Sequence, residues 1–159
     1  MKALHACRRV LLLSAFCAAC WVSSCMGQDG SAAELQHRAD AASGRECARL
    51  SMAAARQALE DADRYFGSGD GKAAHRAIDV SAHYARRSAD CSLGARKGEK
   101  ATEIELRKLI RRMNDISQTL DSVDRPHLSR ALAELQNERQ RLLQALFGAA
   151  AGGPPEKKP

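Results

Sequence analysis

The sequence lacks the motifs that most often mark an enzyme or a metal site. After residue 25 it has no nucleophile elbow, no His-Glu-x-x-His, no Cys-x-x-Cys and no carboxylate dyad with a definable pocket. The histidines of this region are never four residues apart, as a metal-binding pair on one helical turn would be, and we expect them to be solvated surface residues: His37, His75, His83 and His127. We therefore predict no enzymatic activity, no metal and no other cofactor.

Long hydrophobic runs and a large excess of one charge are also absent. The longest apolar stretch, residues 10–22, covers 13 residues, which is too short to span a bilayer as a permanent anchor. With Lys2, Arg8 and Arg9 before it, the stretch is typical of a secretory signal peptide, predicted here as residues 1–24. Removing that segment leaves 22 basic and 19 acidic residues, a net charge of +3. This modest charge gives no indication of nucleic-acid binding.

The signal segment ends in the sequence Val22-Ser23-Ser24-Cys25. These residues resemble the lipobox of bacterial lipoproteins, in which an aliphatic residue, two small residues and a cysteine direct acylation of the thiol and cleavage before it. The resemblance implies lipidation at Cys25 and, because Met26 stands where an inner-membrane retention signal has aspartate, the periplasmic face of the outer membrane in a double-membraned cell. Ordinary cleavage would instead give a soluble periplasmic or secreted protein, and an uncleaved segment would remain as an anchor.

The chain after the signal divides into three regions by composition. Residues 25–42 are polar and alanine-rich and are predicted to be a lipidated tether, helical from about Ala32. Residues 43–147 have helical periodicity throughout and form the predicted helical domain. Residues 148–159 are rich in glycine and proline and are predicted to be a disordered tail.

The strongest pattern lies in residues 102–147, where large residues form two heptad rows on either side of Pro126. The first row is Leu106, Leu109, Met113, Ile116, Leu120 and Val123, and the second is Leu128, Leu132, Leu135, Arg139, Leu142 and Leu146. Paired about the turn, the rows match in six layers, beginning with Val123 against Leu128. This predicts an antiparallel, coiled-coil-like hairpin. Arg139 lies opposite Met113, where we expect its stem to be buried and its guanidinium to reach outward.

Two earlier helices are predicted on either side of a glycine-rich turn at residues 67–71. Ser43 and Glu46 fit a capping box at the start of the first, and Asp70 is placed to cap the second. A further capping box, Thr102 with Glu105, would open the helix that carries the first leucine row.

Aligning these two earlier helices about Gly69 places large residues beside small ones, such as Tyr84 beside Ala54. The same register sets Cys47 beside Cys91, and in an oxidising compartment we expect these two cysteines to form a disulfide. The two hairpins together predict an all-α fold, a four-helix bundle.

Residues 62–81 place small and aromatic residues at positions used by tetratricopeptide-type hairpins: Ala62, Tyr65, Gly69, Ala74 and Ile78. The segment therefore resembles one such repeat, which implies a peptide-binding ancestry. No second copy follows at the period of about 34 residues, and arrays of this kind need about three copies. The pattern is also similar to the alanine-rich hairpins of bacterial envelope lipoproteins, so packing alone is the competing interpretation.

Four basic residues lie on the back of the helix that carries the first leucine row: Arg107, Lys108, Arg111 and Arg112. A solvated face is the ordinary explanation of such a run, and two glutamates in the same helix favour local neutralisation. The functional alternative is contact with an acidic partner or with anionic lipid head groups, which salt would weaken.

These features predict a non-enzymatic exported lipoprotein that binds a protein partner or acts as a scaffold in the bacterial cell envelope, with its membrane contact through a lipid at Cys25. The alternative is a small-ligand or ion-binding helical bundle in the periplasm, with its cavity between the two hairpins. A hydrolase of envelope polymers is a third hypothesis, and an inward carboxylate pair in a cleft would be its sign.

Overall fold

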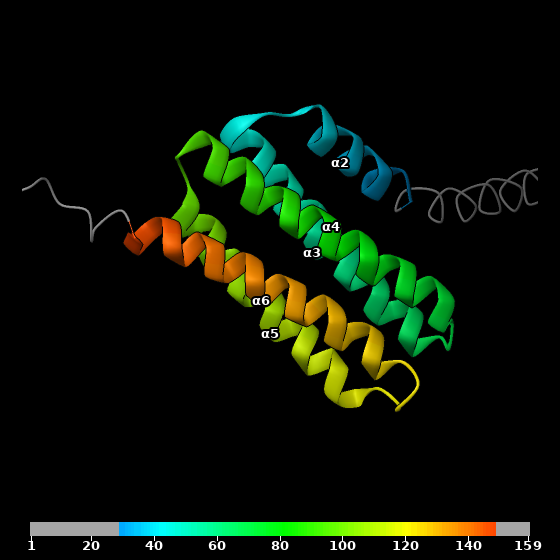
Figure 1. Cartoon of the computed structure of the whole chain (residues 1–159). Coiled ribbons are helices and arrows are strands. Elements are labelled where there is room, and N and C mark those ends of the chain that lie inside the picture. The colour runs from blue at the N-terminus through cyan, green and yellow to red at the C-terminus, as the bar shows by residue number, and fades with distance from the viewer. Residues whose placement is uncertain (1–28, 149–159) are drawn as a thin grey trace, which may run out of the picture. The chain divides into compact units, whose positions relative to one another are not determined.

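The computed structural model describes residues 29–148, which form five α-helices and no strand (Figure 1). The helices are α2 (Asp29–Ala41), α3 (Gly44–Gly67), α4 (Gly71–Ala95), α5 (Glu99–Thr119) and α6 (Arg125–Gly148). The predicted all-α class is confirmed, but the described helices number five rather than four, because the segment before α3 is itself helical. The chain separates into two units at residue 35, and the packing described below is that of residues 35–148.

The antiparallel helices α3 and α4 make the most extensive contact in the fold. Their facing sides carry small residues, so the two backbones can lie close together. Two buried serines of α4 donate hydrogen bonds across this contact to main-chain carbonyls of α3: Ser81 Oγ to Ala55 O at 2.9 Å and Ser88 Oγ to Ala48 O at 2.7 Å. The turn between the helices uses Gly69 in the left-handed conformation, where a glycine meets no steric penalty.

The helix starts at Ser43 and Asp70 were predicted correctly and the start at Thr102 wrongly, but of the predicted capping hydrogen bonds only that of Asp70 is present. Asp70 caps α4 as expected, since its Oδ1 accepts from Ala73 N at 2.9 Å. The Ser43 side chain makes no capping hydrogen bond, and Glu46 instead binds Arg49. The second predicted capping box is also wrong, because α5 starts at Glu99 and Thr102 lies inside that helix. The Thr102 side chain is buried.

In the α5–α6 hairpin most of the two predicted rows are buried. Eight members are no more than 9% exposed: Leu106, Leu109, Met113, Ile116, Leu128, Leu132, Leu135 and Leu142. The layer next to the turn is wrong, because Val123 is 82% exposed while its expected partner Leu128 is fully buried. Since α5 ends at Thr119, Val123 belongs to the turn and cannot extend the row.

The two hairpins pack on each other through one hydrophobic core, with α6 against α4 and α5 against α3 (Figure 1). Two side-chain hydrogen bonds across each contact have the same difference in residue number. The difference is 49 for Arg56–Glu105 and Asp63–Arg112 between α3 and α5, and 48 for Arg86–Glu134 and Asp79–His127 between α4 and α6. A constant difference in residue number means that α5 runs parallel to α3, and α6 parallel to α4. The second hairpin is thus stacked on the first in the same direction.

The C-terminal half of α2 packs on α4, although the sequence placed residues 25–42 in a tether. Ala39 is fully buried, and Tyr84 Oη donates a 3.0 Å hydrogen bond to Asp40 Oδ2. Arg87 Nη2 donates to the Asp40 carbonyl at 2.9 Å, which satisfies an acceptor at the end of the helix. An alanine side chain is small and adds little to the hydrophobicity of a segment. Composition alone therefore did not predict that this segment would pack on α4.

Within residues 29–148, no helix combines the length and the apolar character needed to cross a membrane.

Candidate functional site

The predicted lipidation site, Cys25, lies outside the described residues, and so does the predicted signal peptide. The predicted cysteine pair is present: a disulfide joins Cys47 and Cys91, with their Cα atoms 5.9 Å apart. It ties the first turn of α3 to the last turns of α4, because the two helices are antiparallel. Its place in the hairpin indicates a structural bond.

The predicted basic face of α5 is largely neutralised by carboxylates. Three of its members have acidic neighbours: Arg107 with Glu103 at 3.8 Å, Lys108 with Glu105 at 2.8 Å, and Arg112 with Asp63 at 2.6 Å. Of the four, only Arg111 has no ion-pair partner among the described residues. The face is therefore not one continuous cationic surface, and the pair formed by Arg112 helps to hold α5 against α3.

Arg139, in the second leucine row, does not point freely into solvent as the sequence suggested. Its Nε donates to Glu103 Oε1 at 2.8 Å, joining α6 to α5. Glu103 is 7% exposed and is the only buried acid among the residues whose burial the structure describes. The arginine therefore supplies the partner that a buried carboxylate requires.

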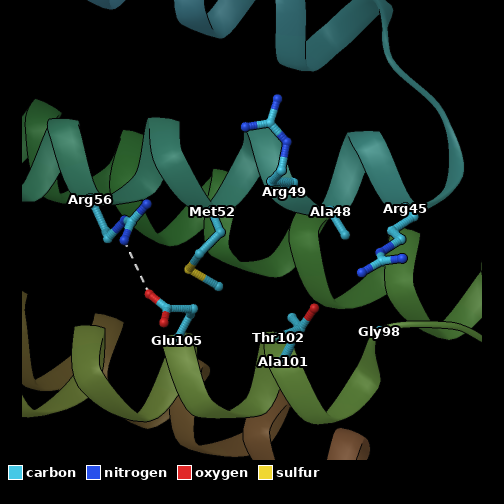
Figure 2. Close-up of a pocket in the computed structure, with 9 residues that line it drawn as sticks. All are labelled: Arg45, Ala48, Arg49, Met52, Arg56, Gly98, Ala101, Thr102 and Glu105. Atoms are coloured by element: carbon cyan, nitrogen blue, oxygen red, sulfur yellow. Dashed lines mark hydrogen bonds and ion pairs between the residues drawn. The ribbon is translucent and has the colours of Figure 1, made fainter.

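A cleft of about 430 Å³ opens between α3 and α5 (Figure 2). Three arginines of α3 line the cleft, at residues 45, 49 and 56, with Met52 between them. These four residues are three or four apart in sequence and therefore lie on one face of the helix. Figure 2 shows Arg45 extending into the space above Gly98, and Arg56 bound to Glu105. The Arg56 Nη1 and Glu105 Oε2 atoms are 3.1 Å apart. Arg45 has no ion-pair partner among the described residues.

The apolar part of this cleft consists of Met52, Ala48 and Ala101 (Figure 2). Its volume lies within the range of about 300–1,000 Å³ that small-molecule pockets occupy. An arginine beside an apolar surface is suited to a ligand with a negative charge and an apolar body. The sequence indicated a cavity between the two hairpins but none of the residues of this cleft, because they come together only where α5 lies against α3.

A second hollow, the outer groove, lies between α5 and α6 and has a volume of about 500 Å³. It is formed by Arg107, Ile110, Arg111, Gln136, Arg139 and Gln140. Two of the four predicted basic residues thus belong to one site, joined by an arginine from the other helix. The Nε atom of Arg107 is buried and has no hydrogen-bond partner in the described part of the chain.

Two of the histidines are also brought together, contrary to their expected solvated state. The rings of His75 and His127 are stacked, with centroids 4.4 Å apart and an interplanar angle of 13°. His127 Nε2 lies 2.9 Å from Asp79 Oδ1, and His75 Nε2 lies 2.8 Å from Asp124 Oδ1, although off the direction of a hydrogen bond. This stack links α4 to α6. Among the described residues, no group of three or more His, Cys, Asp or Glu side chains is arranged to hold a metal ion.

Comparison with known proteins adds no relative: no protein-family model matches the chain, and no curated protein or solved structure is significantly similar to it.

Proposed function

We propose that this chain is a non-enzymatic lipoprotein of the bacterial cell envelope that binds a protein partner or organises an envelope complex. In this proposal residues 1–24 are removed during export and a lipid on Cys25 holds the protein to the outer membrane. The helices α3 to α6 form a four-helix bundle whose second hairpin is coiled-coil-like.

The observation that supports a binding role is the contrast between the interior and the surface. Alanine, leucine and other apolar side chains fill the core, whereas the arginine-lined cleft and the outer groove are open to solvent. Arginine is enriched where proteins recognise partners, because its planar guanidinium offers several donors at once. A packed core with arginine-lined hollows at its surface favours recognition over chemistry.

Metabolic labelling tests the anchor. We expect a labelled palmitate analogue to be incorporated into the wild-type protein and to be lost in Cys25→Ser, because the acylated thiol is absent from that variant. Gel fluorescence of immunoprecipitated protein measures this directly. Cys47→Ser with Cys91→Ser is the matched control, which removes the disulfide-bonded cysteines at the other two positions and should keep the label. Label retained in Cys25→Ser would contradict lipidation at this residue.

Cross-linking in intact membranes followed by affinity purification tests the partner. We expect the wild-type protein to enrich a defined set of envelope proteins, and Cys25→Ser to lose that set because the variant is no longer held at the membrane. A stoichiometric small molecule retained by purified protein, with no protein enriched, would support the other class of function.

That second candidate is a small-ligand-binding protein of the periplasm, and the α3–α5 cleft favours it. Arg45 and the apolar surface of Met52 offer both a charge and a contact area to one ligand. In this second proposal the ligand lies between α3 of the first hairpin and α5 of the second, the location that the sequence indicated for the cavity of a ligand-binding bundle. Native mass spectrometry of the protein as purified would show a bound mass that Arg45→Glu reduces.

A further inference from the structure

The outer groove faces away from the first hairpin. On α5, Glu105 and Arg112 point to α3, since both form ion pairs with it. An α-helix turns about 100° per residue, so Arg107 lies about 200° around the helix from Glu105, on the opposite side. Because the hairpins are stacked, the groove occupies the face of the second hairpin on which no further helix of the described chain is packed.

Positive charge exceeds negative charge in this groove. Three arginines meet there, Arg107, Arg111 and Arg139, and the carboxylate that binds to this cluster is Glu103. One carboxylate compensates one guanidinium, so two positive charges remain. Glu103 lies closer to Arg139, at 2.8 Å, than to Arg107, at 3.8 Å. The other two arginines differ in their surroundings: Arg111 is exposed, whereas the Arg107 Nε atom is buried without a hydrogen bond.

The outer groove also contains one apolar side chain and two uncharged polar side chains. Ile110 is half-buried and lies between the two α5 arginines in sequence, on the same side of the helix. Gln136 and Gln140 are exposed on the α6 side, one helical turn apart. Their amides can both donate and accept hydrogen bonds, as a main chain does.

We propose that the outer groove binds an acidic segment of a partner protein, with two carboxylates on Arg107 and Arg111 and an apolar side chain over Ile110. The two arginines are four residues apart and present a row of charge along the helix, with side-chain origins about 6 Å apart. Such a row matches successive carboxylates of a polypeptide better than the single charge of one lipid head group. Each guanidinium can bind a carboxylate through two hydrogen bonds. This proposal rests on the proposed function and identifies the chemistry of its partner.

Fluorescence anisotropy with a defined probe tests the proposal. The probe is a labelled peptide of aspartates and glutamates around one leucine, titrated with the full exported protein in detergent. Arg111→Glu with Gln140→Glu reverses the charge of the groove, and neither residue has a hydrogen-bond or ion-pair partner among the described residues. Arg76→Glu with Gln118→Glu is the matched control, with the same charge change at exposed positions outside the groove.

We expect the groove variant to weaken peptide binding by on the order of tenfold or more, and the control to change it by less than about threefold. Binding of the wild type should fall as salt is raised. Equal affinities for the two variants, or no binding to the wild type, would overturn the proposal. A second arm uses sedimentation with phosphatidylglycerol vesicles and the unacylated Cys25→Ser protein. Vesicle binding that depends on the groove residues, without peptide binding, would also overturn it in favour of a lipid.

The proposed function fails separately from this inference. If cross-linking in membranes enriches the same partners for the wild type and for the Arg111→Glu, Gln140→Glu variant, the binding role stands and the groove is wrong as its site. If the peptide binds at the groove but Cys25→Ser keeps its palmitate label, the groove stands and the lipid anchor is wrong.

Discussion

The two hairpins have the same antiparallel topology but are held together in different ways. In α3–α4 the facing residues are small, serines donate hydrogen bonds to the opposite main chain, and a disulfide closes the open end. In α5–α6 the facing residues are mostly leucines, and the cross-link is an ion pair between Arg139 and Glu103. Large side chains stabilise a hairpin by removing more apolar area from water, at about 25 cal/mol per Å². An alanine side chain removes less apolar area from water than a leucine does, and in α3–α4 the disulfide and the cross-helix hydrogen bonds stabilise the hairpin in addition to this burial.

Removal of the disulfide should have the largest effect on this comparison. The loop between Cys47 and Cys91 spans 44 residues. The chain-entropy model assigns about 4 kcal/mol to closing a loop of this size, as an upper estimate. We expect Cys47→Ser with Cys91→Ser to lower the free energy of unfolding, measured by urea denaturation, by up to that amount. A non-reduced native protein that shows two free thiols by mass spectrometry would contradict the bond itself.

Breaking the ion pair of the second hairpin should have a smaller effect. Arg139→Leu would leave the buried carboxylate of Glu103 without its closest partner. Loss of one member of a fully buried pair costs about 3–5 kcal/mol, and because the Arg139 side chain is 38% exposed we expect about 2 kcal/mol. Urea denaturation provides the measurement.

The double variant Arg139→Leu with Glu103→Leu is the control, because it removes the buried charge together with its partner. We expect it to recover most of the lost stability, since apolar replacement of a buried pair is often neutral or stabilising. Equal losses in the single and double variants would mean that the pair contributes through packing rather than charge.

The smallest expected effect concerns α2, which packs on the first hairpin. Burial, followed by the hydrogen bond to Asp40, raises the pKa of Tyr84 above its usual value. The folded state therefore favours the neutral phenol, so this stability is complete below pH 10.0, the value of a free tyrosine, and is lost as pH rises through the higher folded pKa.

Local opening of α2, measured by hydrogen exchange of its amides, should therefore become faster by a factor of a few when the pH rises above the pKa of Tyr84 in the folded protein. Tyr84→Phe should remove the pH-dependent step, because a phenylalanine cannot ionise. It should also accelerate exchange slightly at neutral pH, since the bond to Asp40 contributes about 1 kcal/mol. A pH-dependent step that persists in Tyr84→Phe would assign it to another group.

Features set by local periodicity could be predicted from the sequence. The leucine rows, the Asp70 cap and the opposition of Cys47 to Cys91 all follow from residues three or four apart on a helix and from a turn between them. The exposed Val123 shows where this reasoning stops, since a heptad row does not say where the helix ends.

Features set by the stacking of the hairpins could not be predicted in this way. His75 and His127 are 52 residues apart, and no periodicity connects them. The outer groove could be predicted only in part: Arg107 and Arg111 share one face of a helix, but Arg139 joins them from another helix. The α3–α5 cleft likewise requires the parallel arrangement of two helices that are not consecutive in the chain.

The packing of α2 sets the length of the linker between a lipid at Cys25 and the folded domain. Leu35, the first residue of the packed unit, is ten residues beyond Cys25. Ten residues reach at most about 35 Å when fully extended, and this segment is shorter because α2 begins at Asp29, so a lipid at Cys25 would hold the fold close to the bilayer. A partner embedded in the same membrane would meet the groove at a high effective concentration, on the millimolar scale for short linkers. Even a weak acidic contact would then be occupied for much of the time.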